Sequence, residues 1–157
     1  MREIHGSLGG EGLRACLVAA RFNETISGQL VAGATRALRQ HGVADGDLEL
    51  IWVPGAFEIP VAAAERLHLG GVDCLIALGA VIRGETPHFE YVASAAASGI
   101  AELGMRHRVA TGFGVLTVDT VDQAMARAGG KLGNKGWEAA VAALELASVL
   151  RQLRPEP

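Results

Sequence analysis

Between an apolar run and a long segment of small residues, the chain contains the stretch Gly79-Ala80-Val81-Ile82-Arg83-Gly84-Glu85-Thr86-Pro87-His88-Phe89-Glu90. The preceding run, residues 74–78, is typical of a buried strand, and the following segment is typical of a helix. Thr86 is a good N-cap residue, and Pro87 suits the first helical position, where a missing N–H costs nothing. This stretch therefore predicts a strand, a turn and the start of a helix.

The predicted helix start has the properties of an anion site. Its first N–H groups lack partners within the helix, and the helix dipole makes this end partly positive, which suits a phosphate group. His88 lies one residue inside the helix, and histidine can exchange a proton near neutral pH. His88 could equally be an ordinary surface residue of a first turn. The residues indicate a phosphate pocket with an adjacent proton carrier.

Apolar runs and helical patterns alternate along the rest of the chain. The short apolar runs predict buried parallel strands, and apolar residues at helical spacing predict the segments between them. The predicted strands are residues 13–20, 48–53, 72–78 and 109–118, and the predicted helices are residues 26–41, 60–69, 87–106, 121–128 and 137–153, with a loop at 129–136. This alternation predicts an α/β fold with a parallel sheet and helices on both faces.

Size and composition limit the protein to a few classes. A chain of 157 residues predicts one domain, residues 13–157, after a loosely attached arm, residues 1–12, which could add a short strand to a neighbour's sheet. Half of the residues are hydrophobic and the mean hydropathy is +0.28, so part of the apolar surface is expected to be buried between copies of the chain. The net charge of −3 is scattered, and no nucleic-acid partner is expected.

Several other classes are excluded by the motifs. No apolar run reaches the roughly 18 residues of a membrane span, and residues 1–12 contain no apolar core for a signal peptide. Cys16 and Cys74 lie in apolar runs and are expected to be buried, reduced thiols of a cytoplasmic protein. No residues have metal-ligand spacing, and no G-x-S-x-G, P-loop or G-x-G-x-x-G motif is present.

Three loops carry unusual residues, and in parallel sheets ligands bind beyond the carboxyl ends of the strands. After the first strand, Phe22 is either a cap on the core or a platform for a heteroaromatic ring. After the second, Glu58 is either a partner of the helix dipole or an acceptor for ligand hydroxyl and N–H groups. The third loop is the stretch quoted above. The sequence therefore predicts a site at this edge of the sheet.

Further residues keep two interpretations each. Arg127 either complements a helix dipole or clamps a phosphate, and Lys135 is spaced to pair with Glu138 on one helical face. The small residues at 93–99 either reflect high helix propensity or form a close contact between helices.

The residues together resemble the 6,7-dimethyl-8-ribityllumazine synthase family over nearly the whole chain. The resemblance rests on residues 21–23, 53–60, 79–92, 113–117, 133–136 and 138–140. It implies a three-layer α/β sandwich, with a four-stranded parallel flavodoxin-like sheet and a short N-terminal strand that pairs with a neighbouring subunit. It also implies the penultimate step of riboflavin biosynthesis, a transferase reaction. In this step, 5-amino-6-(D-ribitylamino)uracil and 3,4-dihydroxy-2-butanone 4-phosphate give 6,7-dimethyl-8-ribityllumazine, phosphate and water, with neither metal nor organic cofactor.

The resemblance also implies a role for each site residue. Phe22 would stack on the pyrimidine, and His88 would move protons. The other expected contacts are Ala56, Phe57 and Glu58 with the ribityl chain, the backbone of Ala80, Val81 and Ile82 with the pyrimidine edge, Gly84, Glu85, Thr86 and Arg127 with phosphate, and Phe113 and Lys135 with the pyrimidine substrate. Phe113, Arg127 and Lys135 would come from a neighbouring subunit.

The family forms pentamers, and some members assemble sixty-subunit capsids. The small residues at 93–99 suit the centre of a pentamer, and the short connection at 129–134 resembles that of capsid-forming members. We therefore expect a capsid, which could enclose riboflavin synthase as a partner.

Two rival functions share parts of this pattern. A flavodoxin-like redox protein would have the same sheet and would bind flavin tightly. A flavin- or lumazine-binding protein, or a shell component without turnover, would need no phosphate clamp. The presence of Phe22, His88, Arg127 and Lys135 together favours the enzyme.

Overall fold

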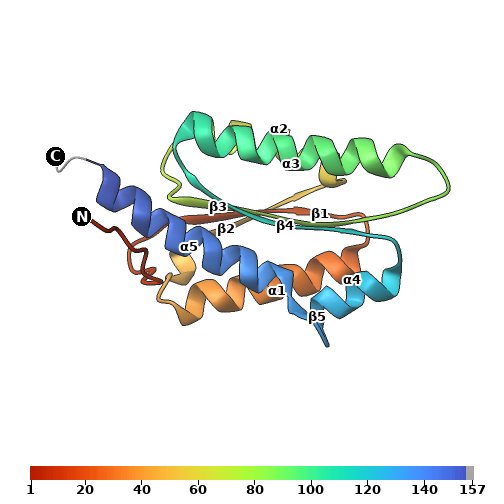
Figure 1. Ribbon diagram of the computed structural model, residues 1–157, viewed down its shortest axis with the longest axis horizontal. Helices are drawn as coiled ribbons and strands as arrows, with labels where there is room; N and C mark the ends of the chain where they lie inside the picture. The colour runs from red at the N-terminus through yellow and green to blue at the C-terminus, as the bar shows by residue number, and fades with distance from the viewer. Residues whose placement is uncertain (155–157) are drawn as a thin grey trace.

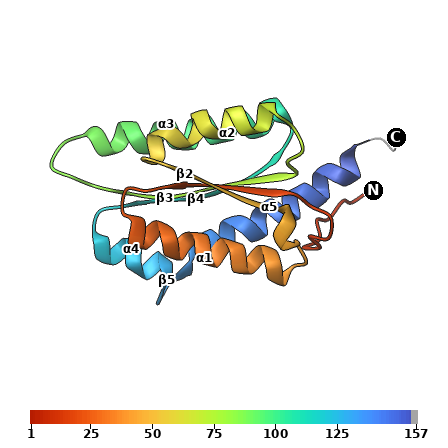
Figure 2. The same cartoon turned by 180° about the vertical axis from the view of Figure 1, so that it is seen from behind.

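A four-stranded parallel sheet forms the middle layer of the computed structural model, which describes residues 1–154. The strand order is β2-β1-β3-β4. Helices α2 and α3 cover one face, and α1, α4 and α5 cover the other (Figure 1, and from behind in Figure 2). This arrangement is a flavodoxin-like α/β sandwich of three layers, and it confirms the predicted fold class.

The elements alternate along the chain as the hydrophobic pattern predicts. The strands are β1 Ala15–Ala20, β2 Leu48–Val53, β3 Cys74–Ile82, β4 Ala110–Val118, β5 Ala128–Gly130 and β6 Gly133–Asn134. The α-helices are α1 Glu24–Gln40, α2 Ile59–His68, α3 His88–His107, α4 Val121–Arg127 and α5 Lys135–Leu153, and the short 3₁₀ turns are η1 Asp45–Asp47 and η2 Ala56–Glu58. The predicted domain extends to residue 157, but residues 155–157 lie outside the described residues. They include Pro155, before which the last helix is predicted to end.

Continuous burial explains the position of β1 in the sheet. All six of its residues are buried, and it pairs in parallel with both β2 and β3. A strand covered on both faces needs apolar residues at every position, which is why residues 15–20 do not alternate. Helix α1 instead shows one apolar stripe, Ile26, Leu30, Ala34 and Leu38, and all four are buried against the sheet side.

Two segments differ from the prediction. Residues 79–82, predicted as a loop, continue β3 because their pairing with β4 extends to Ile82 and Val118. The predicted loop at 129–136 contains the antiparallel pair β5 and β6, after which α5 begins at Lys135. Asn134 caps this helix by accepting a hydrogen bond from the Trp137 N–H at 3.0 Å.

The predicted capping of α3 is wrong by one residue. Pro87, not Thr86, is the N-cap residue, and no side chain caps this helix. The ψ angle of Pro87, 3°, is not helical, although its carbonyl already accepts a bond from the Glu90 N–H at 3.0 Å. Thr86 is therefore outside the helix, and its hydroxyl does not cap it.

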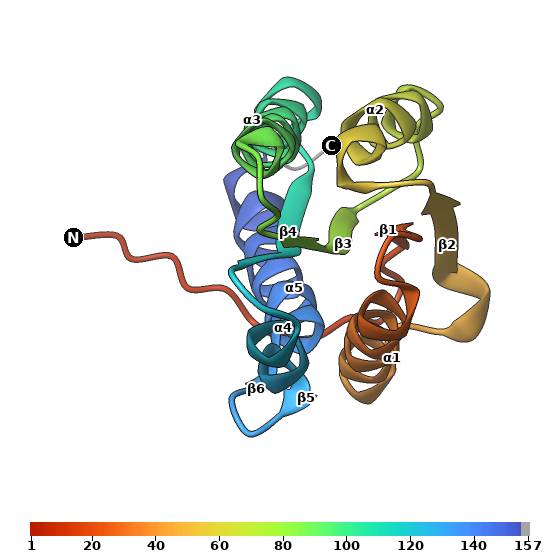
Figure 3. The same ribbon diagram turned by 90° about the vertical axis from the view of Figure 1, so that its right-hand side faces the viewer.

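The first twelve residues form no strand in the described chain, and pairing with a neighbouring subunit stays a prediction. Residues 5–7 lie instead along the end of α5, where the Gln152 side chain donates to the His5 carbonyl at 2.7 Å and the Ser7 N–H donates to Ser148 Oγ at 3.0 Å. In Figure 3 the first residues run away from the body of the domain. Within residues 1–154, no helix combines the length and apolarity that crossing a bilayer requires.

Candidate active site

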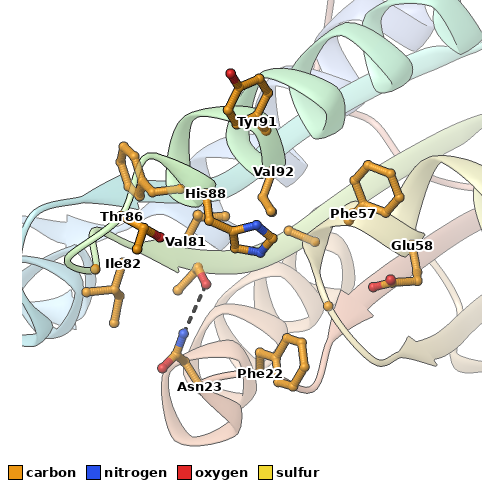
Figure 4. Close-up of a pocket in the computed structure, with 15 residues that line it drawn as sticks. Phe22, Asn23, Phe57, Glu58, Val81, Ile82, Thr86, His88, Tyr91 and Val92 are labelled. Carbon is orange, nitrogen blue, oxygen red and sulfur yellow. Dashed lines mark hydrogen bonds between the residues drawn. The ribbon is translucent and has the colours of Figure 1, made fainter.

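A cavity of about 640 Å³ lies at the carboxyl ends of β1, β2 and β3. The loops after these three strands meet there, as the sequence predicts (Figure 4). The lining residues are Phe22, Asn23, Gly55, Ala56, Phe57, Glu58, Ala80, Val81, Ile82, Gly84, Thr86, His88, Phe89, Tyr91 and Val92. A cavity of this size can hold one or two small molecules.

The loop after β1 presents an open aromatic ring. Phe22 is 68% exposed, so the interpretation of this residue as a cap on the core is wrong. Its backbone N–H donates to the Pro54 carbonyl at 2.9 Å, which ties the loops after β1 and β2 together. Asn23, in the left-handed conformation with φ 60°, donates from its side chain to the Ala80 carbonyl at 3.1 Å. The ring is therefore held by backbone contacts while its face stays accessible.

The loop after β2 places a carboxylate and a second aromatic ring at the cavity. Ala56 is buried, whereas Phe57 is 58% exposed. Glu58 is the N-cap residue of α2, but its side chain makes no capping hydrogen bond, so it is free to accept bonds from a ligand. A Cβ atom at Gly55 would lie 2.7 Å from Cδ2 of Phe22 and 3.0 Å from Oε2 of Glu58. Glycine at this position therefore lets the ring and the carboxylate approach each other.

The end of β3 forms the floor of the cavity. β1 stops pairing with β3 at Leu78, whereas β4 pairs with it as far as Ile82. Residues 79–82 therefore have a strand partner on one side alone, and beyond the end of β1 the Asn23 side chain bonds to Ala80. An unpaired strand edge offers backbone hydrogen bonds in a fixed row. This geometry explains how backbone groups of β3 can face a ligand.

The connection from β3 to α3 supplies the polar wall. Gly84 and Thr86 line the cavity, whereas Glu85 does not. His88, the first residue of α3, is exposed, and Figure 4 shows its imidazole pointing into the cavity between Thr86 and Phe57. Tyr91 and Val92 follow on the same helical face, because residues three and four positions apart are neighbours on a helix.

Four predicted site residues lie outside the cavity lining: Glu85, in the loop between β3 and α3, and three residues of other elements. Phe113 belongs to β4, one of the two edge strands of the sheet. Arg127 ends α4, where it donates to the Gln123 carbonyl at 3.1 Å, and Lys135 begins α5, where it pairs with Glu138 at 2.5 Å as its spacing predicts. Among the described residues that line the cavity there is neither Lys nor Arg. A phosphate bound in this chain alone would therefore lack a basic side chain.

Both cysteines are remote from this chemistry. Burial raises the pKa of the Cys16 thiol to about 12, and the nearby Glu49 carboxylate adds to the rise. Burial likewise raises the pKa of the Cys74 thiol to about 12, with a smaller contribution from Asp73. Protonated, buried thiols are poor nucleophiles. Both cysteines are free and buried, as predicted. Within residues 1–154, no three His, Cys, Asp or Glu side chains are grouped as a metal site.

The structure adds site residues to which the sequence pattern assigns no role: Asn23, Gly55, Phe89, Tyr91 and Val92. Tyr91 and Val92 could have been found from their spacing of three and four residues after His88. Asn23 had no such signal, because its contact with Ala80 joins residues 57 positions apart.

Comparison with known proteins finds the same family that the sequence motifs resemble. The family model described as 6,7-dimethyl-8-ribityllumazine synthase matches residues 12–151. A curated relative from Anaeromyxobacter dehalogenans (strain 2CP-C), named 6,7-dimethyl-8-ribityllumazine synthase, is 51% identical over 157 residues. The match covers 100% of this chain and 97% of the relative.

Proposed function

The chain belongs to the 6,7-dimethyl-8-ribityllumazine synthase family, and from this premise we propose the reaction that it catalyses. The 5-amino group of 5-amino-6-(D-ribitylamino)uracil condenses with the ketone of 3,4-dihydroxy-2-butanone 4-phosphate. This condensation releases one water and gives an imine. The imine then loses phosphate, and ring closure with loss of a second water gives 6,7-dimethyl-8-ribityllumazine. One observation supports this most strongly: an open aromatic ring, an unpaired strand edge, a glycine-containing loop and an imidazole line the same cavity.

The pyrimidine substrate occupies the side of the cavity formed by the loops after β1 and β2. The exposed Phe22 ring stacks on the pyrimidine, which has a flat face of similar size. Backbone groups of Ala80, Val81 and Ile82 bond to the pyrimidine edge, and Ala56, Phe57 and Glu58 hold the ribityl chain. The free Glu58 carboxylate suits ribityl hydroxyl groups, which donate hydrogen bonds.

The phosphate substrate occupies the opposite side, at Gly84, Glu85 and Thr86. Backbone N–H groups and the Thr86 hydroxyl bind the phosphate, and the Glu85 carboxylate stays outside the cavity. His88 lies between the two subsites, where it removes a proton as the amine attacks and supplies one as water and phosphate leave. The amine is already a nucleophile, so the reaction needs no activated side-chain nucleophile, metal or organic cofactor. Much of the rate enhancement comes from holding both substrates in reacting geometry.

A neighbouring subunit completes the site. The cavity lining in the described chain has no Lys or Arg, and Phe113, Arg127 and Lys135 lie elsewhere on the same chain. We therefore assign them to the site of an adjacent copy, with Arg127 as the phosphate clamp. The copies form a pentamer and then a sixty-subunit capsid, which could enclose riboflavin synthase. Residues 1–12 act as an arm between subunits, residues 13–157 form the one domain, and the protein works in the cytoplasm.

The test is an absorbance assay for lumazine formation from the two purified substrates. We expect product and one phosphate for each lumazine formed. A well-folded protein that binds lumazine without forming it would support a binding protein instead. A yellow preparation with a reversibly reduced flavin would support a redox protein, and either outcome would overturn the proposal.

A further inference from the structure

Arg83 lies at the point where β3 ends and the loop to α3 begins, beside the cavity but not in its lining. Its backbone N–H donates to the Val118 carbonyl at 2.9 Å, which extends the pairing with β4 by one residue. We propose that Arg83 is a positioning residue that holds the β3–α3 loop in the shape that binds phosphate. This inference rests on the proposed function, because it assumes that residues 84–86 bind the phosphate substrate.

The Arg83 side chain joins the start of this loop to its end. The guanidinium carbon lies 4.6 Å from the centre of the Phe89 ring, and Nη1 lies 3.9 Å from Oε1 of Glu90. Both partners belong to the first turn of α3, just after the loop. The connection between β3 and α3 is a wide loop in Figure 1, and residues 83–88 are exposed. Contacts across both ends reduce the number of conformations that the residues between them can adopt.

The same guanidinium is fixed to a third element. Its Nε donates to Oδ1 of Asp119 at 2.7 Å, in the connection between β4 and α4. Asp119 is itself held, because its backbone N–H donates to Oε1 of Gln123 at 2.8 Å. The Gln123 N–H in turn donates to the hydroxyl of Thr120, which caps α4. Arg83 therefore connects the loop to the capped start of α4.

The geometry requires an arginine. A guanidinium is planar, so it can stack on Phe89 while its edge bonds to Asp119. A lysine ammonium is a point charge and cannot make both contacts in this way. We therefore expect Arg83→Lys to weaken the hold on the β3–α3 loop nearly as much as Arg83→Met does.

The effect of Arg83 should be local. The Arg83 and Asp119 side chains are 50% and 63% exposed, and exposed ion pairs contribute little to global stability. Arg39 and Asp45 form a comparably exposed pair away from the cavity, with side chains 58% and 74% exposed. Arg39→Met is therefore the matched control, because it removes the same kind of contact without touching the loop.

The first experiment measures amide hydrogen exchange in the intact assembly. Arg83→Met should exchange faster at residues 84–89 than the wild type, and Arg39→Met should not. Exchange elsewhere in the sheet should not change. Unchanged exchange at residues 84–89 in Arg83→Met would overturn the inference. This readout needs no turnover, so it remains decisive even if the wild type forms no lumazine and the proposed function fails.

The second experiment separates positioning from direct binding of phosphate. If Arg83 acts through Asp119, Arg83→Met and Asp119→Asn should each raise the KM for the phosphate substrate by about fivefold. The double variant should have a KM no higher than either single variant, because both changes remove the same interaction. The KM for the pyrimidine substrate should stay constant. If Arg83 binds phosphate itself, Asp119→Asn should leave this KM unchanged or lower it, because the guanidinium becomes free. That result, with an active wild type, would overturn the inference and leave the proposed function intact.

Discussion

His88 lies in the cavity lining between the residues proposed for the two subsites. It begins α3, and its imidazole points into the cavity rather than along the surface (Figure 4). A single general acid–base group contributes roughly 10²–10⁴-fold to a rate. We expect His88→Ala to reduce kcat within that range while turnover stays measurable, because both substrates are still held together. Steady-state kinetics tests this, with His68→Ala, an exposed histidine at the end of α2, as the control. A folded His88→Ala that binds substrate but has no activity would contradict it.

Arg127 is proposed to clamp the phosphate of an adjacent site. Its guanidinium is tied to the Gln123 carbonyl alone among the hydrogen bonds of the described chain, and it therefore has further N–H donors for a ligand. Arg127→Ala should raise the KM for the phosphate substrate by about tenfold or more and leave the KM for the pyrimidine substrate unchanged. A change confined to the pyrimidine substrate would show that the clamp is assigned wrongly.

The two buried thiols are expected to make the free energy of unfolding depend on pH in the alkaline range. Burial raises the pKa of each thiol from 9.0 to about 12, so the unfolded chain loses these protons before the folded chain does. Between these values the unfolded state binds fewer protons, and stability falls as pH rises, by at most about 1.4 kcal/mol per pH unit for each thiol. Urea unfolding at about pH 8 and about pH 10 measures this loss. The Cys16→Ala/Cys74→Ala variant should show a smaller loss, and an equal one would contradict the account.

At the scale of elements, α1 and α5 pack so closely that a methyl group decides the fit. A Cβ atom at Gly136, near the start of α5, would lie 2.8 Å from the Leu30 carbonyl carbon of α1. Backbone cannot give way as a side-chain end can, so the two helices would have to move apart. The packing of these helices therefore depends on glycine at position 136.

This contact gives a paired prediction for two glycines. Gly136→Ala should destabilise the protein by about 1–3 kcal/mol, the usual cost of overpacking. Gly28, inside α1, has open space where a Cβ would lie, so Gly28→Ala should stabilise by up to about 1 kcal/mol through helix propensity. Thermal unfolding of both variants in the same buffer and concentration checks the opposite signs. Equal shifts would show that close packing is not the cause.

At the scale of the whole molecule, the described chain exposes many large apolar side chains. Phe57, Val61, Leu69, Tyr91 and Met105 are each between 58% and 75% exposed. Contiguous exposed apolar surface is typical of protein interfaces, and part of this surface is expected to be buried between copies of the chain. We expect light scattering of the purified protein to give the mass of a sixty-subunit particle. A mass of five chains would support the pentamer and contradict the capsid.

Sites shared between subunits make a separate prediction about mixed assemblies. If Arg127 of one copy completes the site that contains His88 of another, His88→Ala and Arg127→Ala subunits should complement each other. Mixed particles then contain some sites with both native residues, and activity at low phosphate-substrate concentration should exceed that of either variant alone. The control is a mixture of the two variants assembled separately. Activity no higher in the mixed particles would place both residues in one chain's own site.

The sequence by itself determined the layers of this protein and the three loops at one edge of the sheet. Patterns such as the nearly continuous apolar run at 13–20 and the stripe of α1 are local, because burial on one or both faces sets which positions must be apolar. The family motifs are equally local, so Phe22, Glu58 and His88 stand out in the order of residues alone.

The tertiary structure decided where elements end and which side chains meet. β3 continues to Ile82 because β4 lies beside it, and Asn23 reaches Ala80 because β1 stops short. Arg83 and Asp119, which hold each other at the mouth of the loop, are 36 residues apart. Such contacts depend on pairing across the sheet, and hydrophobic periodicity carries no information about partners so distant in sequence.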